Sequence, residues 1–228
     1  MAIRLLLLIA TVGAASSGCA AAPQHPPVAA EQVAPDRVLD FAVLYRNNCA
    51  GCHGVEGRGG VALDLANPIY LAIADDRVIR RATAEGVRGT SMPAFAQRAG
   101  GMLTDAQVDA IVTGMRAQWA TADVAAGVAL PPYAEPSPGD PAHGEAVLTT
   151  YCAHCHGPRG ERAPSGGSIV DRSYLALVSD QGLRTTIIAG RRDLHAPDWR
   201  NNVPGHPMTG QEISDVVAWL SAQRGPHE

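Results

Sequence analysis

Two copies of one five-residue motif constrain this 228-residue chain more than any other feature. Residues 49–53 read Cys-Ala-Gly-Cys-His, and residues 152–156 read Cys-Ala-His-Cys-His. In each copy two thiols are separated by two residues, and an imidazole follows at once. A fold for this chain must therefore present the same three donor groups twice.

This spacing is typical of covalent haem attachment. Two thiols placed so at the end of a helix can reach the two vinyl groups of one porphyrin. The imidazole that follows is then directed at the iron. The sequence thus predicts two haem c groups. The expected thioether cysteines are Cys49 and Cys52 for haem 1 and Cys152 and Cys155 for haem 2, with His53 and His156 as iron ligands.

Two other interpretations of the cysteines are open. Four thiols could form one zinc site shared between the halves of the chain, or each pair could be a thioredoxin-like redox motif. A zinc site leaves both trailing histidines unexplained. The redox motif goes with a strand–helix–strand context that is absent from the sequence. Haem attachment is therefore the favoured interpretation.

The two motifs belong to an internal repeat. His53 and His156 are 103 positions apart, and Thr104 and Thr209 are 105 apart. Four further pairs share an offset of 104: Tyr70 and Tyr174, Asp76 and Asp180, Arg80 and Arg184, and Gly86 and Gly190. Two single-residue insertions reconcile both halves, which indicates duplication of one small haem domain.

The expected fold class is all-α. Apolar residues at helical spacing precede each motif, and they also follow Thr104 and Thr209, which are good N-caps. Only two Phe stand beside 24 Gly and 17 Pro, so a packed core needs another apolar body, which haem would supply. The predicted haem domains are residues 36–119 and 140–226, joined by a Pro/Ala-rich linker at 120–139.

The N-terminal residues predict export and lipid attachment. Arg4 precedes an apolar run of eleven residues, 5–15, which is too short to span a bilayer. Residues 16–19, Ser-Ser-Gly-Cys, resemble a bacterial lipobox. We expect a signal peptide at 1–18, a lipid on Cys19 and a disordered Ala/Pro/Gln-rich tether at 19–35. Plain secretion without Cys19 is the alternative, but lipid attachment gives all five cysteines a role.

Both halves resemble class I cytochrome c domains, in which a few helices surround one haem. In that family a Met before the last helix is usually the sixth iron ligand. The first half has Gly-Thr-Ser-Met-Pro-Ala-Phe at residues 89–95. The resemblance implies His53 and Met92 as the ligands of haem 1. Met102 and Met115 fit better as packing residues.

The second half departs from this pattern. At the offset of 104, Met92 corresponds to Ala196, although Pro93 still corresponds to Pro197. His195 is the favoured replacement because it adjoins the vacated position. The alternatives are Met208, which aligns with the expected packing residue Leu103, then His206 in a Gly-His-Pro turn, and an open iron.

Two weaker features also follow from the resemblance. Pro164 is similar to the family proline whose carbonyl orients the iron-binding imidazole, and Val61 stands at the equivalent spacing in the first half. Arg80 and Arg184 could meet haem propionates, or could equally be exposed helix arginines.

The function expected from these features is single-electron transfer, without enzyme activity. The chain would be a lipid-anchored carrier on the periplasmic side of a bacterial membrane, between a quinol-oxidising complex and a terminal oxidase or photosynthetic reaction centre. A haem subunit of a larger oxidoreductase and a peroxidase-like enzyme with an open second haem are the alternatives. The net charge of −4 gives no indication of nucleic-acid binding.

Overall fold

The structure, a computed structural model, describes residues 33–122, 124–125 and 127–225. Within these residues every regular element is a helix and no strand is formed, so the all-α prediction is confirmed. The predicted signal peptide, Cys19 and the tether up to residue 32 lie outside the described residues.

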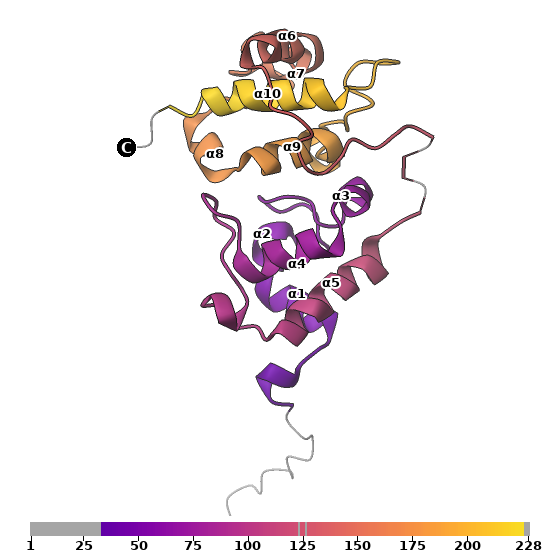
Figure 1. The fold of residues 1–228 in the computed structure, drawn as a ribbon, viewed down its shortest axis with the longest axis vertical. Helices are drawn as coiled ribbons and strands as arrows, with labels where there is room; N and C mark the ends of the chain where they lie inside the picture. The colour runs from indigo at the N-terminus through magenta and orange to yellow at the C-terminus, as the bar shows by residue number, and fades with distance from the viewer. Residues whose placement is uncertain (1–32, 123, 126, 226–228) are drawn as a thin grey trace, which may run out of the picture. The chain divides into compact units, whose positions relative to one another are not determined.

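Apart from one additional 3-10 helix at the start of the first half, the helices follow the same order in both halves (Figure 1). The first half contains η1 (Pro35–Arg37), α1 (Phe41–Asn48), α2 (Ala50–His53), α3 (Pro68–Ile73), α4 (Asp76–Glu85), η2 (Gln97–Ala99) and α5 (Asp105–Trp119). The second contains α6 (Pro141–Tyr151), α7 (Ala153–His156), α8 (Arg172–Leu177), α9 (Asp180–Ala189), η3 (Arg192–Leu194) and α10 (Gly210–Ala222). The sequence repeat is therefore also a repeat of structure.

The last helix of each half begins at the predicted threonine. Thr104 Oγ1 accepts the N–H of Gln107 at 3.2 Å, and Gln107 Oε1 accepts the N–H of Thr104 at 3.0 Å. Thr209 and Glu212 form the same reciprocal pair, with distances of 3.1 and 2.7 Å. Each pair satisfies two backbone donors that a helix start leaves without partners.

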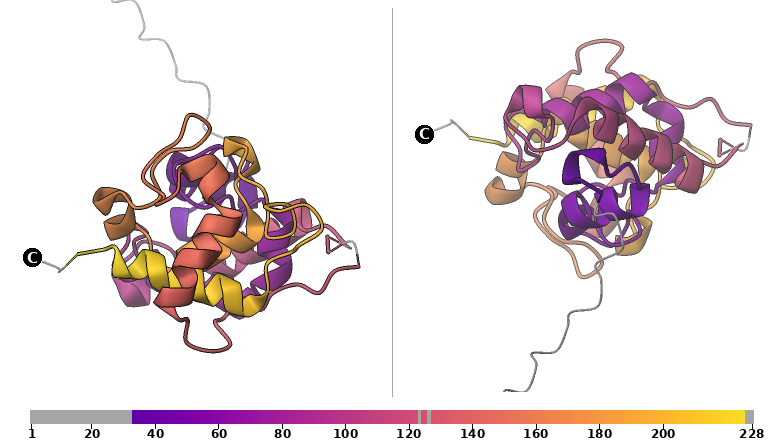
Figure 2. Two further views of the ribbon diagram at one scale, coloured as in Figure 1. Left: turned by 90° about the horizontal axis from the view of Figure 1, so that it is seen from above. Right: turned by 90° about the horizontal axis from the view of Figure 1, so that it is seen from below.

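The last helix of each half packs on the first helix of that half. α5 lies against α1, and α10 crosses α6 (Figure 2). Met115 is 1 % exposed on the buried face of α5, as expected for a packing residue. Met102 is 81 % exposed, so its predicted packing role is wrong. It lies in the turn before α5, outside the apolar face of that helix.

The linker is attached to the second half rather than extended as a tether. Arg184, which is 2 % exposed, donates from Nε and Nη2 to the carbonyl of Pro132 at 3.2 and 3.1 Å, and from Nη1 to Ser214 Oγ at 3.2 Å. Its repeat equivalent, Arg80, instead forms surface ion pairs on α5. Both arginines thus have protein partners, and Arg184 is not the exposed residue that the sequence allowed.

From Ala34 onward the chain forms one compact unit, with buried side chains of both halves in one continuous cluster. Helices α3 and α9 make the main helix contact between the halves. None of the helices in the described residues is long and apolar enough to cross a membrane.

Candidate haem-binding sites

Each motif forms a tight helical turn directly after a longer helix. Cys49 ends α1, donating its N–H to Tyr45 O at 2.8 Å, and its own carbonyl accepts the N–H of His53 at 3.0 Å. In the second half, Cys152 donates to Leu148 O and accepts from His156, both at 2.9 Å. The backbone therefore places two thiols and one imidazole on a single turn in both halves.

The surroundings of the first thiol of each motif disfavour a thiolate. All four motif cysteines are free in the described chain. Burial, with a smaller contribution from the other thiol of the motif, raises the pKa of Cys49 to about 11 and that of Cys152 to about 11. A thioredoxin-like pair depends on a lowered thiol pKa. The first thiol of each motif does not fit that alternative.

Both motif imidazoles are oriented by the same kind of hydrogen bond. His53 Nδ1 lies 2.7 Å from Leu63 O, and His156 Nδ1 lies 2.7 Å from Gly167 O. Because a carbonyl can only accept, each Nδ1 must carry the proton, which leaves Nε2 free as a metal ligand. Leu63 and Gly167 are 104 positions apart, so this contact follows the repeat.

The prediction that Pro164 orients the His156 imidazole is wrong. Pro164 is exposed, and the carbonyl that accepts from His156 belongs to Gly167. In the first half the acceptor is Leu63 rather than Val61, the position equivalent by spacing. The error arose because the resemblance supplied a proline at a fixed spacing, whereas the loop path decides which carbonyl faces the ring.

Met92 lies in the loop between α4 and η2. Its carbonyl accepts the N–H of Val87 at 3.1 Å, and its own N–H donates to Thr90 Oγ1 at 3.1 Å. Thr90 Oγ1 in turn donates to Val87 O at 2.8 Å. These bonds hold the loop backbone at Met92, while the thioether is half-buried.

The second half repeats this loop with Ala196 in the place of Met92. Arg191 donates its N–H to Ala196 O at 3.0 Å, just as Val87 donates to Met92 O. His195, directly before it, is exposed and has φ 61°, the one positive φ of a non-glycine residue in the described chain. A side chain in this conformation is uncommon, although His is enriched there.

The other two candidates for the second iron lie further along this loop. Met208 is 3 % exposed and donates its N–H to Trp199 O at 2.9 Å, as Leu103 donates to Phe95 O in the first half. Met208 therefore occupies a packing position. His206 is exposed in the turn before α10.

A family model described as "Cytochrome C oxidase, cbb3-type, subunit III" matches residues 36–113 and 139–220. The two matched stretches contain one motif each and together cover more than half of the chain. The chain belongs to this family. It is a c-type cytochrome, an electron-transfer protein that holds haem c through covalent bonds.

Solved c-type cytochromes are among the similar structures. The KustC0563 c-type cytochrome is 27 % identical over 36 % of this chain and 99 % of its own, with a TM-score of 0.31. Cytochrome cL from the marine bacterium Methylophaga aminisulfidivorans is 30 % identical over 36 % of this chain and 53 % of its own, with a TM-score of 0.30. The reducing HAO-like complex of Kuenenia stuttgartiensis is 15 % identical over 80 % of this chain and 94 % of its own, with a TM-score of 0.44. No curated protein matches the chain.

The donor set at each motif of this family member fits haem c. The chain supplies two free thiols for the thioether bonds and an imidazole whose Nε2 is available to the iron. The zinc alternative lacks a site, because the described residues contain no cluster of three or more His, Cys, Asp or Glu side chains that could bind a metal ion.

Sequence reasoning missed the residues that join the two sites. Arg191 donates from Nη2 to Gly60 O at 2.9 Å, and Asn67 donates from Nδ2 to Ala189 O at 2.9 Å. The sequence contained one indication that the position of Arg191 is special. Its equivalent in the first half is Val87, so a charge stands at this loop position in one half alone.

Proposed function

We propose that this cytochrome carries two haem c groups and transfers single electrons through them, without catalysing a reaction of its own. The observation that carries the proposal is the repeated contact of the motif imidazoles. His53 and His156 each donate Nδ1–H to a backbone carbonyl at 2.7 Å, from acceptors 104 positions apart. The presence of the same contact in both halves supports one haem at each motif.

The residues of haem 1 suit electron transfer rather than substrate chemistry. Bound haem supplies an iron that gains or loses one electron. Cys49 and Cys52 would hold the haem covalently, His53 would ligate the iron in the tautomer that Leu63 fixes, and Met92 would be the second protein ligand. A thioether ligand raises the potential relative to a second imidazole. If His53 and Met92 both ligate the iron, no coordination position would be left for a substrate.

At haem 2 we assign His156 and His195 as ligands. His195 adjoins Ala196, which takes the place of Met92 in the loop, and its exposed imidazole is not engaged in packing. Met208 is already engaged in packing. Two imidazoles should lower the potential of haem 2 relative to haem 1.

The mass of the holoprotein tests the number of haems. Protein matured in a bacterial periplasm should show two haem additions that survive denaturation. Replacing Cys49 and Cys52 with Ser should remove one addition, and replacing Cys152 and Cys155 should remove the other. A wild-type mass with one addition or none would contradict the proposal.

We further propose that a lipid on Cys19 anchors the chain to the periplasmic side of a bacterial membrane. There it would carry electrons from a quinol-oxidising complex to a terminal oxidase or photosynthetic reaction centre. Two or more acyl chains give stable anchoring where a single chain does not. Wild-type protein should enter the detergent phase on phase partitioning, and Cys19→Ala should enter the aqueous phase. Wild-type protein in the aqueous phase would exclude the anchor.

A second candidate function is that of a permanent haem subunit of a larger oxidoreductase. The description of the family as subunit III of a cytochrome c oxidase favours it. Purification from membranes in mild detergent separates the candidates. A subunit should stay in a fixed ratio with oxidase proteins through size-exclusion chromatography, whereas an independent carrier should elute alone.

A further inference from the structure

The loop that carries His195 also reaches into the first half. Arg191 donates from Nη2 to the carbonyl of Gly60 at 2.9 Å. Gly60 belongs to the same loop as Leu63, whose carbonyl orients His53. The guanidinium therefore connects the loop of the predicted sixth ligand of haem 2 with the loop on the His53 side of haem 1.

Two further sets of hydrogen bonds fix this connection between the loops. Arg191 Nε and Nη2 donate to Asp193 at 2.9 and 2.7 Å, and the two side chains are only 13 % and 17 % exposed. Two residues before Arg191, Ala189 O accepts from the buried Asn67 side chain, which also caps α3. The fork of the guanidinium thus bonds to both halves beside a second, buried contact between them.

The cation also lies close to the motif of haem 1. Gly60, whose carbonyl accepts from Arg191, packs against that motif so tightly that a methyl carbon on Gly60 would overlap the Cys52 carbonyl oxygen and lie 2.7 Å from the His53 carbonyl carbon. The Asp64 carboxylate is buried nearby, and its Oδ1 has no hydrogen-bond partner within the described part of the chain. Among charges buried to this extent, electrostatic interactions are less screened than in water.

We propose that Arg191 is a positioning residue that couples the two haem sites, fixing the haem 1 loop against the haem 2 loop and favouring the reduced state of haem 1. The proposal rests on the proposed function, since it requires both haems. An electron that passes from the second iron to the first leaves the second oxidised and the first reduced, and no bond or proton changes. A nearby cation stabilises the state with the lower positive charge, so Arg191 should draw the electron towards haem 1.

Redox titration of the holoprotein tests this coupling. Each haem is followed by its own absorption, with the near-infrared thioether–iron band reporting haem 1. In Arg191→Gln the equilibrium constant for passing an electron from haem 2 to haem 1 should fall about threefold to tenfold, as expected for loss of one partly buried charge. A tenfold change corresponds to 59 mV for one electron.

Two further variants separate charge from geometry. Arg191→Lys keeps the charge but not the planar fork, so it should retain most of the wild-type equilibrium constant. Arg77→Gln removes a side chain that is 92 % exposed and that, among the described residues, forms an ion pair with Asp75 alone, so it should leave the constant unchanged. If Arg191→Gln fails to fold, the equilibrium constant of Arg191→Lys, compared with that of the wild type, still tests the proposal.

The outcomes distinguish this inference from the proposed function. A chain with fewer than two haems by mass would defeat the proposed function. Two haems with a wild-type equilibrium constant in Arg191→Gln would overturn the role of Arg191 alone. A Lys variant that behaves like the Gln variant would also overturn it, because the charge would then have no effect.

Discussion

The ring of Phe41 fills the space that a side chain at Gly114 would need. A methyl carbon on Gly114 would lie 2.6 Å from Cβ of Phe41 and closer still to the ring. In the second half the small residue is on the first helix and the large residue is on the last helix. Gly144 stands where Phe41 stands in the first half, and a methyl carbon there would lie 2.7 Å from Cβ of Trp219. Each half thus crosses its first and last helices through one large and one small residue, on opposite helices.

Gly114→Ala should destabilise the holoprotein. Ala gains about 0.5–1 kcal/mol in helix propensity, but overpacking costs about 1–3 kcal/mol, so the free energy of unfolding should fall. Chemical unfolding measures the change. Gly210→Ala is the matched control, because a methyl group there would meet only Pro132, at 3.9 Å. The double variant with Phe41→Leu should lose less stability than the sum of the single variants. A stabilised Gly114→Ala protein would disprove the overlap.

Arg184→Gln should release the linker from the second half. The change removes a buried donor from Pro132 O and Ser214 Oγ, which should cost about 1–3 kcal/mol. Limited proteolysis should then cut within residues 120–139 faster than in the wild type. Arg80→Gln is the control at the repeat-equivalent position, where surface ion pairs contribute at most about 1 kcal/mol. Equal cleavage of both variants would show that Arg184 does not hold the linker.

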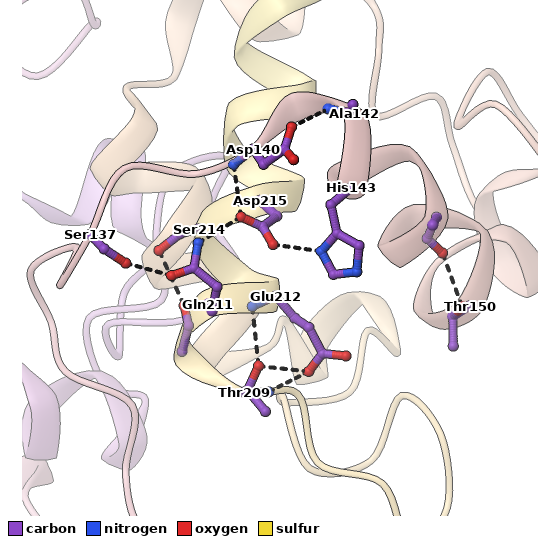
Figure 3. A network of polar contacts seen from close by, with 12 residues as sticks. Ser137, Asp140, Ala142, His143, Thr150, Thr209, Gln211, Glu212, Ser214 and Asp215 are labelled. Atoms are coloured by element: carbon purple, nitrogen blue, oxygen red, sulfur yellow. Dashed lines mark hydrogen bonds and ion pairs between the residues drawn. The ribbon is translucent and has the colours of Figure 1, made fainter.

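The contact of His143 with Asp215 should make the stability of the second half depend on pH (Figure 3). His143 Nδ1 lies 2.6 Å from Asp215 Oδ2, and the Asp215 carboxylate also accepts from the Asp140 N–H and from Gln211. The hydrogen bond to Asp215, with the nearby charges of Asp140 and Glu212, raises the pKa of His143. The folded pKa then lies above the unfolded one.

The stabilisation from this contact should be complete below the unfolded pKa of about 6.5 and lost as the pH rises through the folded value. Unfolding of wild type and His143→Gln between pH 5 and pH 9 measures it. The difference between the two proteins should be largest at the acidic end and should shrink above neutral pH. A difference that grows with pH would mean that folding lowers the pKa of His143 rather than raising it.

Met92→Ala should remove most of the near-infrared thioether–iron band of the oxidised protein and lower the potential of haem 1. The reason is that the half-buried Met92 is the expected source of the thioether. Met102→Ala is the control, since Met102 is 81 % exposed. If the band keeps its full strength in Met92→Ala, the methionine ligand lies elsewhere, with Met208 the first candidate.

His195→Ala should change the low-spin electron paramagnetic resonance signal of oxidised haem 2, since the variant loses the assigned sixth ligand. His206→Ala, another exposed histidine of the same loop region, should leave that signal unchanged. A low-spin signal that persists in His195→Ala would transfer the assignment to Met208 or His206. A high-spin signal in the wild type, with peroxide turnover, would favour the enzyme alternative.

The sequence by itself determined the features that depend on neighbouring residues. The spacing of two cysteines and a histidine defines one helical turn, and Thr104 and Thr209 begin their helices through residues three positions away. The offset between the halves predicted that Ala196 replaces Met92, and the loop hydrogen bonds agree. Such features involve few residues, so short-range patterns are sufficient to predict them.

Only the tertiary structure decided the contacts between distant residues. Arg191 and Gly60 are 131 positions apart, and Arg184 and Pro132 are 52 apart. The use of Gly167 in place of Pro164, and the exposure of Met102, likewise depended on loop paths. A side chain long enough to reach several partners has no preferred one until helix packing brings a carbonyl within hydrogen-bond distance. For that reason the comparison of Arg191 with Val87 could mark the position of the charge, but no local pattern could predict its partner in the other half.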